Sequence, residues 1–258
     1  MVITDKFVYI HIGKTGGTFV EKVLDRLSKE SQVYFNTANP ADREAFGSID
    51  QHETAAEIPE AYAGRNRLFS VRHPFDHYVS HYEYGVWKRP GTQLDGEKAK
   101  ARFADYPDLS FGDFLLAIND WGLRVPPRGA GPRPWEPGLF RRANIGFLTW
   151  NYIRFCFPDP LQVIENLDFY MQEDNWRREL PDAHFLRTHR LNRDLYDFLV
   201  ANGYDAGKLE FILGLERILP AGSMRKARTW ETYYTSELRA YVREKERFIF
   251  AMFPEFDR

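Results

Sequence analysis

The stretch that decides the fold is FVYIHIGKTGGTFVEKVL, residues 7–24, which joins an apolar run to a glycine-rich loop and a helical pattern. Residues 7–12 have almost no polar content, as in a strand buried on both faces. From Phe19 the apolar residues recur at helical spacing, and Thr18 with Glu21 forms a capping box that predicts the helix start. A strand, a glycine-rich turn and a helix N-terminus together make an anion site, because backbone N–H groups and the helix dipole point at one spot.

The composition indicates a globular protein without a strong charge bias. The chain has 258 residues, 43% of them hydrophobic and 16% aromatic, which is enough for one large α/β domain or two small ones. The net charge of -2 argues against a nucleic-acid binder held by bulk positive charge. Cys156 is the single cysteine, and no run approaches the roughly 18 apolar residues of a membrane span. The first residues enter a strand directly, so we expect no signal peptide and a cytoplasmic location; the sequence does not indicate an oligomeric state.

The rest of the chain alternates apolar runs with helical patterns, which favours a mostly parallel sheet covered on both faces. The run NRLFSVR, residues 66–72, is a second buried strand, and Pro74 starts an amphipathic helix. Polar and Pro/Gly-rich stretches indicate a single domain over 1–258 with a loop-rich insertion at about 85–140. Further strands are predicted near 46–50 and at 161–167 and 183–191, with helices at 111–122 and 193–204 and a last helical face of Leu238, Tyr241, Val242, Ile249, Met252 and Phe253.

The glycine-rich loop is not a Walker A motif, because its lysine precedes the glycine pair instead of following the last glycine. It resembles the 5'-phosphosulfate loop of sulfotransferases that use 3'-phosphoadenosine 5'-phosphosulfate (PAPS), closest to the P-K-T-G-G-T form of carbohydrate sulfotransferases. The resemblance implies that Lys14 contacts the oxygen between phosphate and sulfate, where charge builds as the sulfuryl group leaves. A tight turn with a solvated lysine is the alternative. The implied cofactor-binding residues of this loop are Gly13, in place of the proline, Lys14, Thr15, Gly16, Gly17 and Thr18.

A second stretch, FSVRHPFDHYVSHYEY at residues 69–84, resembles the 3'-phosphate motif of the same family. That motif is a strand ending in Arg, then a proline, then a helix with a serine eight residues after the arginine. Arg72 and Ser80 match it, and His73 stands where the family often has Asp or Asn. An arginine fork holds a phosphate through two parallel N–H bonds, and a serine hydroxyl adds a third. The alternative for Arg72 is a structural salt bridge.

A third stretch, residues 223–253, resembles the C-terminal block of the family, with a basic loop and a W-x-x-Y-Y-T sequence. The resemblance implies that Arg225, Lys226 and Arg228 close over the 3'-phosphate; a solvated basic loop is the alternative. Together these blocks imply a P-loop-like three-layer α/β/α sandwich around a mostly parallel sheet. They also imply a PAPS-dependent sulfotransferase that needs no metal and modifies a hydroxyl, by family a saccharide hydroxyl.

The transfer needs a base that takes the proton of the acceptor. SIDQHETAAEIP, residues 48–59, resembles the H-G-H-x-[ST]-A block of the family, with His52 at the second histidine and Asp50 at the first. The resemblance makes His52 the catalytic base, because an imidazole accepts a proton at neutral pH. A surface or capping histidine is the alternative, and Glu53 is the next candidate base. His11, inside the first strand, is interpreted as structural.

Other patterns carry weaker indications. His77 and His81 lie four residues apart on one helical face, but no third ligand accompanies them, so we interpret them as polar groups flanking Ser80 rather than a metal site. Aromatic residues of the segment 103–152 stack on sugar rings or fill a core. Two other functions remain open: an ATP-dependent small-molecule kinase, disfavoured because no G-K-[ST] motif exists, and an inactive nucleotide-binding protein.

Overall fold

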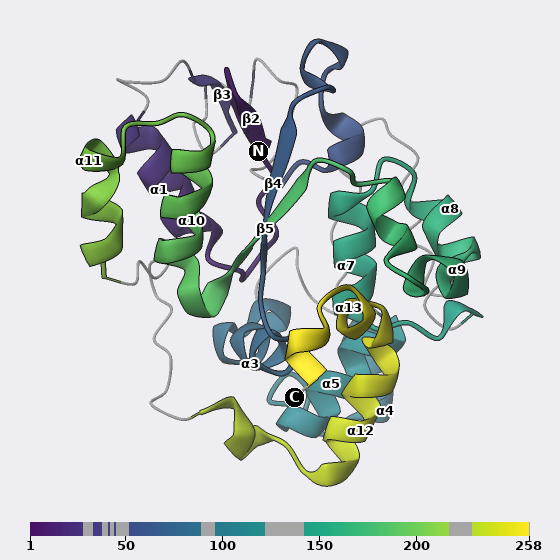
Figure 1. Cartoon of the computed structure of the whole chain (residues 1–258). Coiled ribbons are helices and arrows are strands. Elements are labelled where there is room, and N and C mark those ends of the chain that lie inside the picture. The colour runs from purple at the N-terminus through teal and green to yellow at the C-terminus, as the bar shows by residue number, and fades with distance from the viewer. Residues whose placement is uncertain are drawn as a thin grey trace. The chain divides into compact units, whose positions relative to one another are not determined.

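The computed structural model describes residues 1–27, 33–37, 41, 44, 52–88, 96–121, 142–216 and 229–257 (Figure 1). The chain divides into two compact units, which are described separately below. The first unit consists of Met1–Arg72, Phe155–Pro158 and Arg177–Gly222, and the second of His73–Arg154, Asp159–Trp176 and Ser223–Arg258.

The first unit contains a five-stranded sheet in the order β3-β1-β2-β4-β5. β2 and β5 each pair with β4 in parallel, and β1 runs antiparallel to both of its neighbours. Four of the five strands, all except β1, therefore run in the same direction. This agrees with the mostly parallel sheet that the alternation of strands and helices predicts. The strands are β1 (Val2–Thr4), β2 (Phe7–Tyr9), β3 (Val33–Asn36), β4 (Asn66–Val71) and β5 (Ala183–Arg187).

The structure confirms the strand predicted at residues 66–72. It shortens the other two: the strand expected at 7–12 ends at Tyr9, and the strand expected at 183–191 ends at Arg187, because Thr188–Arg190 form a short 3-10 helix. The hairpin of β1 and β2 is not foreseen, since its turn carries no glycine or proline. The hydroxyl of Thr4 closes this turn instead, because its Oγ1 accepts from the backbone N–H of Phe7 at 2.9 Å and donates to the Phe7 carbonyl at 2.8 Å. The strand suggested near 46–50 lies outside the described residues.

The strand predicted at 161–167 is wrong, because this segment is helical. It forms α8 (Pro160–Glu165) and α9 (Leu167–Met171) of the second unit. Asp159 starts α8, since its side chain accepts from the backbone N–H of Gln162 at 3.1 Å. Three apolar residues of the stretch, Val163, Ile164 and Leu167, are buried at helical rather than strand spacing.

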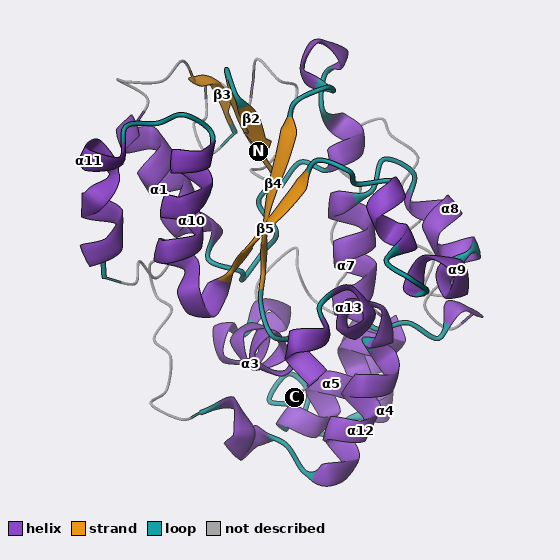
Figure 2. Cartoon of the chain, viewed as in Figure 1, coloured by secondary structure: helices purple, strands orange, loops and turns teal. Residues whose placement is uncertain are grey.

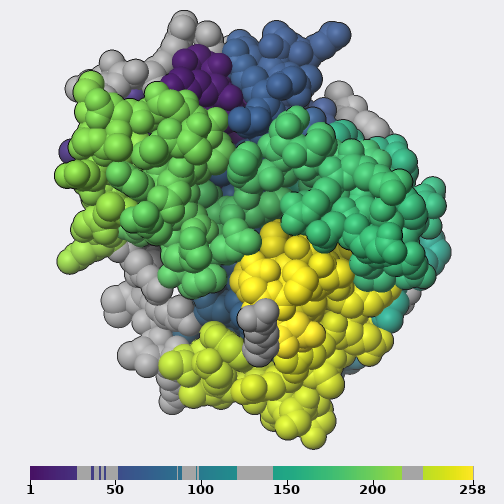
Figure 3. Space-filling view, viewed as in Figure 1, coloured from purple at the N-terminus to yellow at the C-terminus, as the bar shows by residue number. Residues whose placement is uncertain are grey.

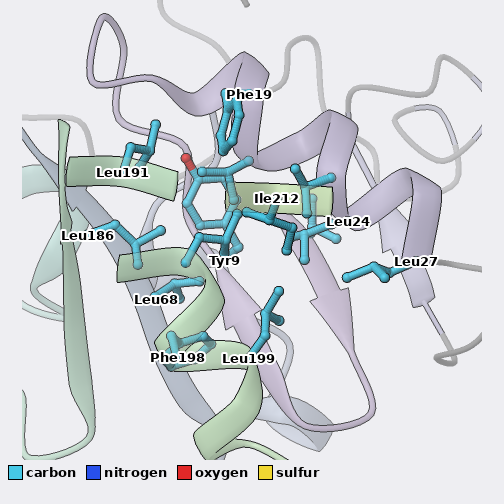
Figure 4. Packing of buried hydrophobic residues seen from close by; sticks show 14 of the residues in the cluster. Tyr9, Phe19, Leu24, Leu27, Leu68, Leu186, Leu191, Phe198, Leu199 and Ile212 are labelled. Carbon is cyan, nitrogen blue, oxygen red and sulfur yellow. The ribbon is translucent and has the colours of Figure 1, made fainter. Parts of the chain in front are cut away.

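Helices of the first unit cover one face of its sheet (Figure 4). They are α1 (Gly17–Leu27), α10 (Leu191–Ala201) and α11 (Ala206–Leu209). α10 lies at the surface (green in Figure 3) and is amphipathic: its outer face carries an ion pair between Arg193 and Asp197, and its inner face is apolar. The buried cluster on this face is Val2, Phe7, Tyr9, Phe19, Val20, Val23, Leu24, Leu27, Leu68, Leu186, Leu191, Leu195, Phe198, Leu199, Leu209 and Ile212.

The capping box predicted at the start of α1 does not form. The helix begins at Gly17, so Thr18 lies inside its first turn and is not the N-cap. The Glu21 carboxylate is buried and contacts the ring of His11, 2.8 Å from Nδ1. A contact from a neighbouring segment therefore replaces the local hydrogen bond that the pattern T-x-x-E usually indicates.

The described residues of the second unit form helices and connecting loops (Figure 2). The helix predicted at 111–122 is confirmed, whereas α4 lies in a stretch that the sequence predicts to be a loop. The single C-terminal helical face belongs to two helices that meet at Glu246. Besides α8 and α9, the helices are α3 (Pro74–Tyr84), α4 (Gly96–Arg102), α5 (Phe111–Trp121), α7 (Phe147–Cys156, ending in the first unit), α12 (Ser236–Lys245) and α13 (Arg247–Met252).

The break at Glu246 is explained by what its carboxylate binds. The fully buried carboxylate accepts from the backbone N–H of Thr149 at 2.6 Å and from that of Leu148 at 3.3 Å, so it caps the N-terminus of α7. It also accepts from the hydroxyl of Tyr78 on α3. One carboxylate thus ties three helices of the second unit together. Within the described ranges no helix has the length and apolar character needed to cross a membrane.

Candidate active site

The loop between β2 and α1 has a backbone shaped for an anion. Lys14 and Gly16 have positive φ angles of 65° and 93°, whereas Gly17 begins α1 in helical conformation. Left-handed residues placed between right-handed ones turn successive N–H groups toward a common point, which makes an anion-binding concavity. Lysine rarely adopts a positive φ, so the loop retains a strained residue at the position that the resemblance makes catalytic.

Buried hydroxyls support this loop from below. Thr15 is fully buried, and its Oγ1 donates to the Ile12 carbonyl at 2.7 Å and lies 2.6 Å from the hydroxyl of Ser70. Ser70 in turn lies 3.3 Å from the hydroxyl of Tyr9. The Thr15 side chain therefore holds the loop on the sheet, and only its backbone is left to bind a ligand. Sequence reasoning missed Ser70, although a polar residue inside a buried strand was a signal for it.

Thr188, directly after β5, is a second support that sequence reasoning missed. Its hydroxyl lies within hydrogen-bond distance of two carbonyl oxygens, at 2.9 Å from that of Val71 and at 3.1 Å from that of Thr15. The end of β4, the end of β5 and the loop are therefore joined at the carboxyl edge of the parallel strands. Ligands of open α/β sheets bind at that edge.

Arg72 follows the last residue of β4 and reaches the same loop. Its Nη1 donates to the Lys14 carbonyl at 3.0 Å. The structure therefore brings together the arginine of the second motif and the lysine of the first, which are 58 positions apart in the chain. A guanidinium carries five N–H donors in a planar fork, a geometry that matches the oxygens of a phosphate.

Ser80 lies on the second turn of α3 in the second unit, where its side chain is half-buried. The helix start explains the departure from the family motif at His73. His73 is the N-cap of α3, and its Nδ1 accepts from the backbone N–H of Phe75 at 3.3 Å, the role that Asp or Asn plays at such positions. Burial lowers the pKa of His73, which keeps Nδ1 able to accept.

His52 packs against the start of the loop in the first unit. Its Nδ1 lies 3.0 Å from the His11 carbonyl oxygen, which can only accept, so Nδ1 carries the proton and Nε2 the lone pair. The His52 ring also lies edge-on to the His11 ring at 4.6 Å and to Phe155 at 6.4 Å. Its Cε1 would be in van der Waals contact, at 4.0 Å, with a Cβ added at Gly13.

Burial lowers the pKa of His52 from its ordinary value to about 3, with His11 as the next cause. His52 is therefore neutral at physiological pH, in the state that a proton acceptor needs. Glu53, the alternative base, is the next residue in the sequence, and its side chain is buried. Asp50 and the basic residues Lys226 and Arg228, together with Arg225, lie outside the described residues.

His77 and His81, interpreted from the sequence as polar groups flanking Ser80, do not lie at the surface. Both side chains are buried in the second unit, and their rings stack on each other at 4.9 Å. They also contact the aromatic rings of Tyr152 and Phe147 edge-on. In the part of the chain that the structure describes, no group of three or more His, Cys, Asp or Glu residues is arranged to hold a metal ion.

A strained glycine-rich loop between a buried parallel strand and a helix N-terminus, with the arginine that follows the neighbouring strand against it, is typical of α/β proteins that bind phosphates. Residues 1–194 match the model of the Sulfotransferase family, and the chain belongs to this family of PAPS-dependent transferases. The match confirms the family that the motifs at residues 13–18 and 69–84 resemble. A search of curated proteins and a search of solved structures each returned no match.

Proposed function

We propose that this protein transfers the sulfuryl group of PAPS to a hydroxyl of a saccharide. The observation that carries the proposal is the hydrogen bond from Arg72 to the Lys14 carbonyl, because it joins the arginine of the 3'-phosphate motif to the lysine of the 5'-phosphosulfate loop within one unit. In this proposal the loop from Gly13 to Thr18 holds the 5'-phosphosulfate. Arg72 and Ser80 hold the 3'-phosphate, and Lys226 and Arg228 close over it.

The loop fits a phosphate in two respects. Its positive φ angles at Lys14 and Gly16 form the concavity that backbone N–H groups need to bind an oxyanion. Gly17 then starts α1, whose first N–H groups have no partner inside the helix and carry the positive end of its dipole. Both contributions act on the same anion, since they come from consecutive residues.

The proposed reaction is an in-line displacement at sulfur. The acceptor oxygen forms a bond to sulfur while the bond from sulfur to the phosphate oxygen breaks, and the electron pair leaves with 3'-phosphoadenosine 5'-phosphate (PAP). The ammonium of Lys14 stabilises the negative charge that grows on that leaving oxygen. Nε2 of His52 takes the proton of the acceptor hydroxyl, because Nδ1 already donates to the His11 carbonyl.

The low pKa of His52 changes the expected pH profile. An ordinary histidine base would make kcat/KM fall below a pH of about 6.5. Since the pKa of His52 is about 3, kcat/KM is expected to show no acidic limb from this residue between pH 5 and 8. A His52→Ala variant should lose about 10² to 10⁴ in kcat and keep its affinity for PAP.

The saccharide acceptor rests on the family resemblance alone. The aromatic residues of the segment 103–152 were one possible platform for sugar rings, but those that are described lie mostly in the core. The buried ones are Phe103, Phe111, Phe114, Phe147, Trp150 and Tyr152, and Tyr106 is half-buried. The cytoplasmic compartment also stays a proposal; its support is the single cysteine, Cys156, which is buried as a free thiol.

The test is sulfuryl transfer from labelled PAPS with a panel of saccharides, in wild type and a Lys14→Ala variant. An interaction that strengthens in the transition state appears in kcat, so Lys14→Ala should lower kcat far more than it weakens PAP binding. Lys22→Ala is the matched control, because Lys22 is an exposed lysine of α1. Transfer by wild type to no saccharide but to another hydroxyl would reject the acceptor, and equal effects of both variants would reject the role of Lys14.

A further inference from the structure

The first unit contains a buried ionisable pair that the reaction above does not use. His11 follows β2, Glu21 lies on α1, and their exposed fractions are only 4% and 6%. The carboxylate Oε1 lies 2.8 Å from His11 Nδ1. Burying a carboxylate is costly even when it is paired, and apolar residues of similar size often stabilise a core as well. A purely structural role therefore does not explain why this pair lies next to the loop.

The His11 ring fills the space behind the N-terminus of α1. A Cβ added at Gly17 would lie 2.0 Å from both Cδ2 and Nε2 of His11, far inside contact distance. The last glycine of the loop is thus needed to admit the ring. Since Glu21 holds Nδ1 and Gly17 borders Nε2, the ring is fixed from both sides.

His11 also fixes His52. Its backbone carbonyl accepts the Nδ1 proton of His52 at 3.0 Å, and the two rings meet edge-on with centroids 4.6 Å apart. The carbonyl selects the tautomer of His52 that has its lone pair on Nε2. A displacement of His11 that moves its backbone carbonyl therefore changes both the orientation and the tautomer of the proposed base.

We propose that Glu21 and His11 are positioning residues, which hold His52 in the tautomer and orientation that proton transfer requires. The contacts form one series within the first unit, from the Glu21 carboxylate to the His11 ring and from the His11 carbonyl to His52. This inference deepens the proposed function, since it rests on His52 as the base. It gives Glu21 a role that its sequence pattern does not indicate.

The test follows the His52 tautomer by ¹⁵N NMR of the histidine rings, together with kcat and PAP affinity. Wild type should show His52 protonated at Nδ1. Glu21→Ala should lose this single tautomer and lower kcat about tenfold to a hundredfold, with the dissociation constant for PAP within threefold. Glu21→Gln keeps an acceptor oxygen and should retain the tautomer and most of kcat. Asp25→Ala, which removes an exposed carboxylate from the same helix, should change neither.

The outcomes separate this inference from the function on which it rests. A His52 tautomer that is unchanged in Glu21→Ala, or that is not Nδ1-protonated in wild type, overturns the positioning role whatever the activity. If Glu21→Ala fails to fold, Glu21→Leu keeps the volume and removes the acceptor, and the same tautomer readout decides. Absence of sulfuryl transfer by wild type would reject the proposed function, while the tautomer would still decide whether the pair positions His52.

Discussion

Replacing Gly17 by alanine tests the packing of the His11 ring on the loop. Gly17 is helical, so the backbone alone favours alanine by about 1 kcal/mol. The added Cβ, however, would lie 2.0 Å from two atoms of the His11 ring, so the ring would have to move by about 1.5 Å to reach van der Waals distance. His11 is buried and bound to Glu21, so it has no room to make this movement freely.

The expected magnitude follows from these opposing terms. Overpacking costs about 1 to 3 kcal/mol, and separating a buried ionisable pair costs about 3 to 5 kcal/mol when it is complete. Against a helix-propensity gain of about 1 kcal/mol, we expect Gly17→Ala to lower the free energy of unfolding by about 2 kcal/mol or more. Urea denaturation measures the difference, provided that the m-value is unchanged.

Making the same Gly17→Ala substitution in a variant without the His11 ring shows whether this ring causes the loss of stability. In a His11→Ala/Glu21→Leu variant the ring is absent and no buried carboxylate is left without its partner. Gly17→Ala should then be neutral or stabilise by up to about 1 kcal/mol, giving a coupling energy of about 2 to 3 kcal/mol. A coupling below about 0.5 kcal/mol would refute the contact and with it the argument that Gly17 helps to fix the His11 ring.

Three further predictions concern stability and pH. Lys14→Gly should be about 1 kcal/mol more stable to urea than Lys14→Ala, because only glycine adopts the φ of 65° without strain; equal stabilities would contradict a strained loop. His73→Asn should keep the cap of α3 and be about 1 kcal/mol more stable than His73→Ala, and no difference would show that Nδ1 does not cap the helix. The folded-state pKa of His52, about 3, lies below its unfolded value near 6.5, so its stabilisation is complete above pH 6.5 and is lost as the pH falls toward 3. His52→Gln should therefore flatten the loss of unfolding free energy between pH 6.5 and 5, and an unchanged slope would contradict a neutral buried imidazole.

Hydrophobic periodicity, together with the glycine and proline residues that end strands and helices, predicts the part of the fold that carries the loop of residues 13–18. Runs of mostly apolar residues predict β2 and β4, and helical spacing predicts α1, α3 and α10, because burial of one helix face is encoded in local order. The segment 161–167 shows the limit. Its apolar run is too short to separate strand from helix by periodicity, and the capping by Asp159 that decides it depends on a single hydrogen bond.

Some residues of the candidate site were likewise predictable from the sequence, and others were not. The resemblance to the two phosphate motifs of the family points to Lys14 and Arg72, and each of them follows an apolar strand at the edge where ligands bind. The contact from Glu21 to His11 was not predictable, since T-x-x-E equally fits a capping box. The hydrogen bond from His52 to the His11 carbonyl joins residues 41 positions apart, and no local sequence pattern indicates a contact between residues so far apart in the chain.

The central claim is that the loop and Arg72 together bind a nucleotide that carries a 3'-phosphate. Calorimetric titration of wild type and Arg72→Ala with PAP, with adenosine 5'-phosphate and with ATP–Mg tests it most directly. Charge-assisted hydrogen bonds contribute about 1.5 to 3 kcal/mol, so PAP should bind wild type about tenfold to a hundredfold more tightly than adenosine 5'-phosphate, and Arg72→Ala should abolish that preference. Binding of ATP–Mg as tight as that of PAP, or an equal loss of both adenosine ligands in Arg72→Ala, would contradict the claim.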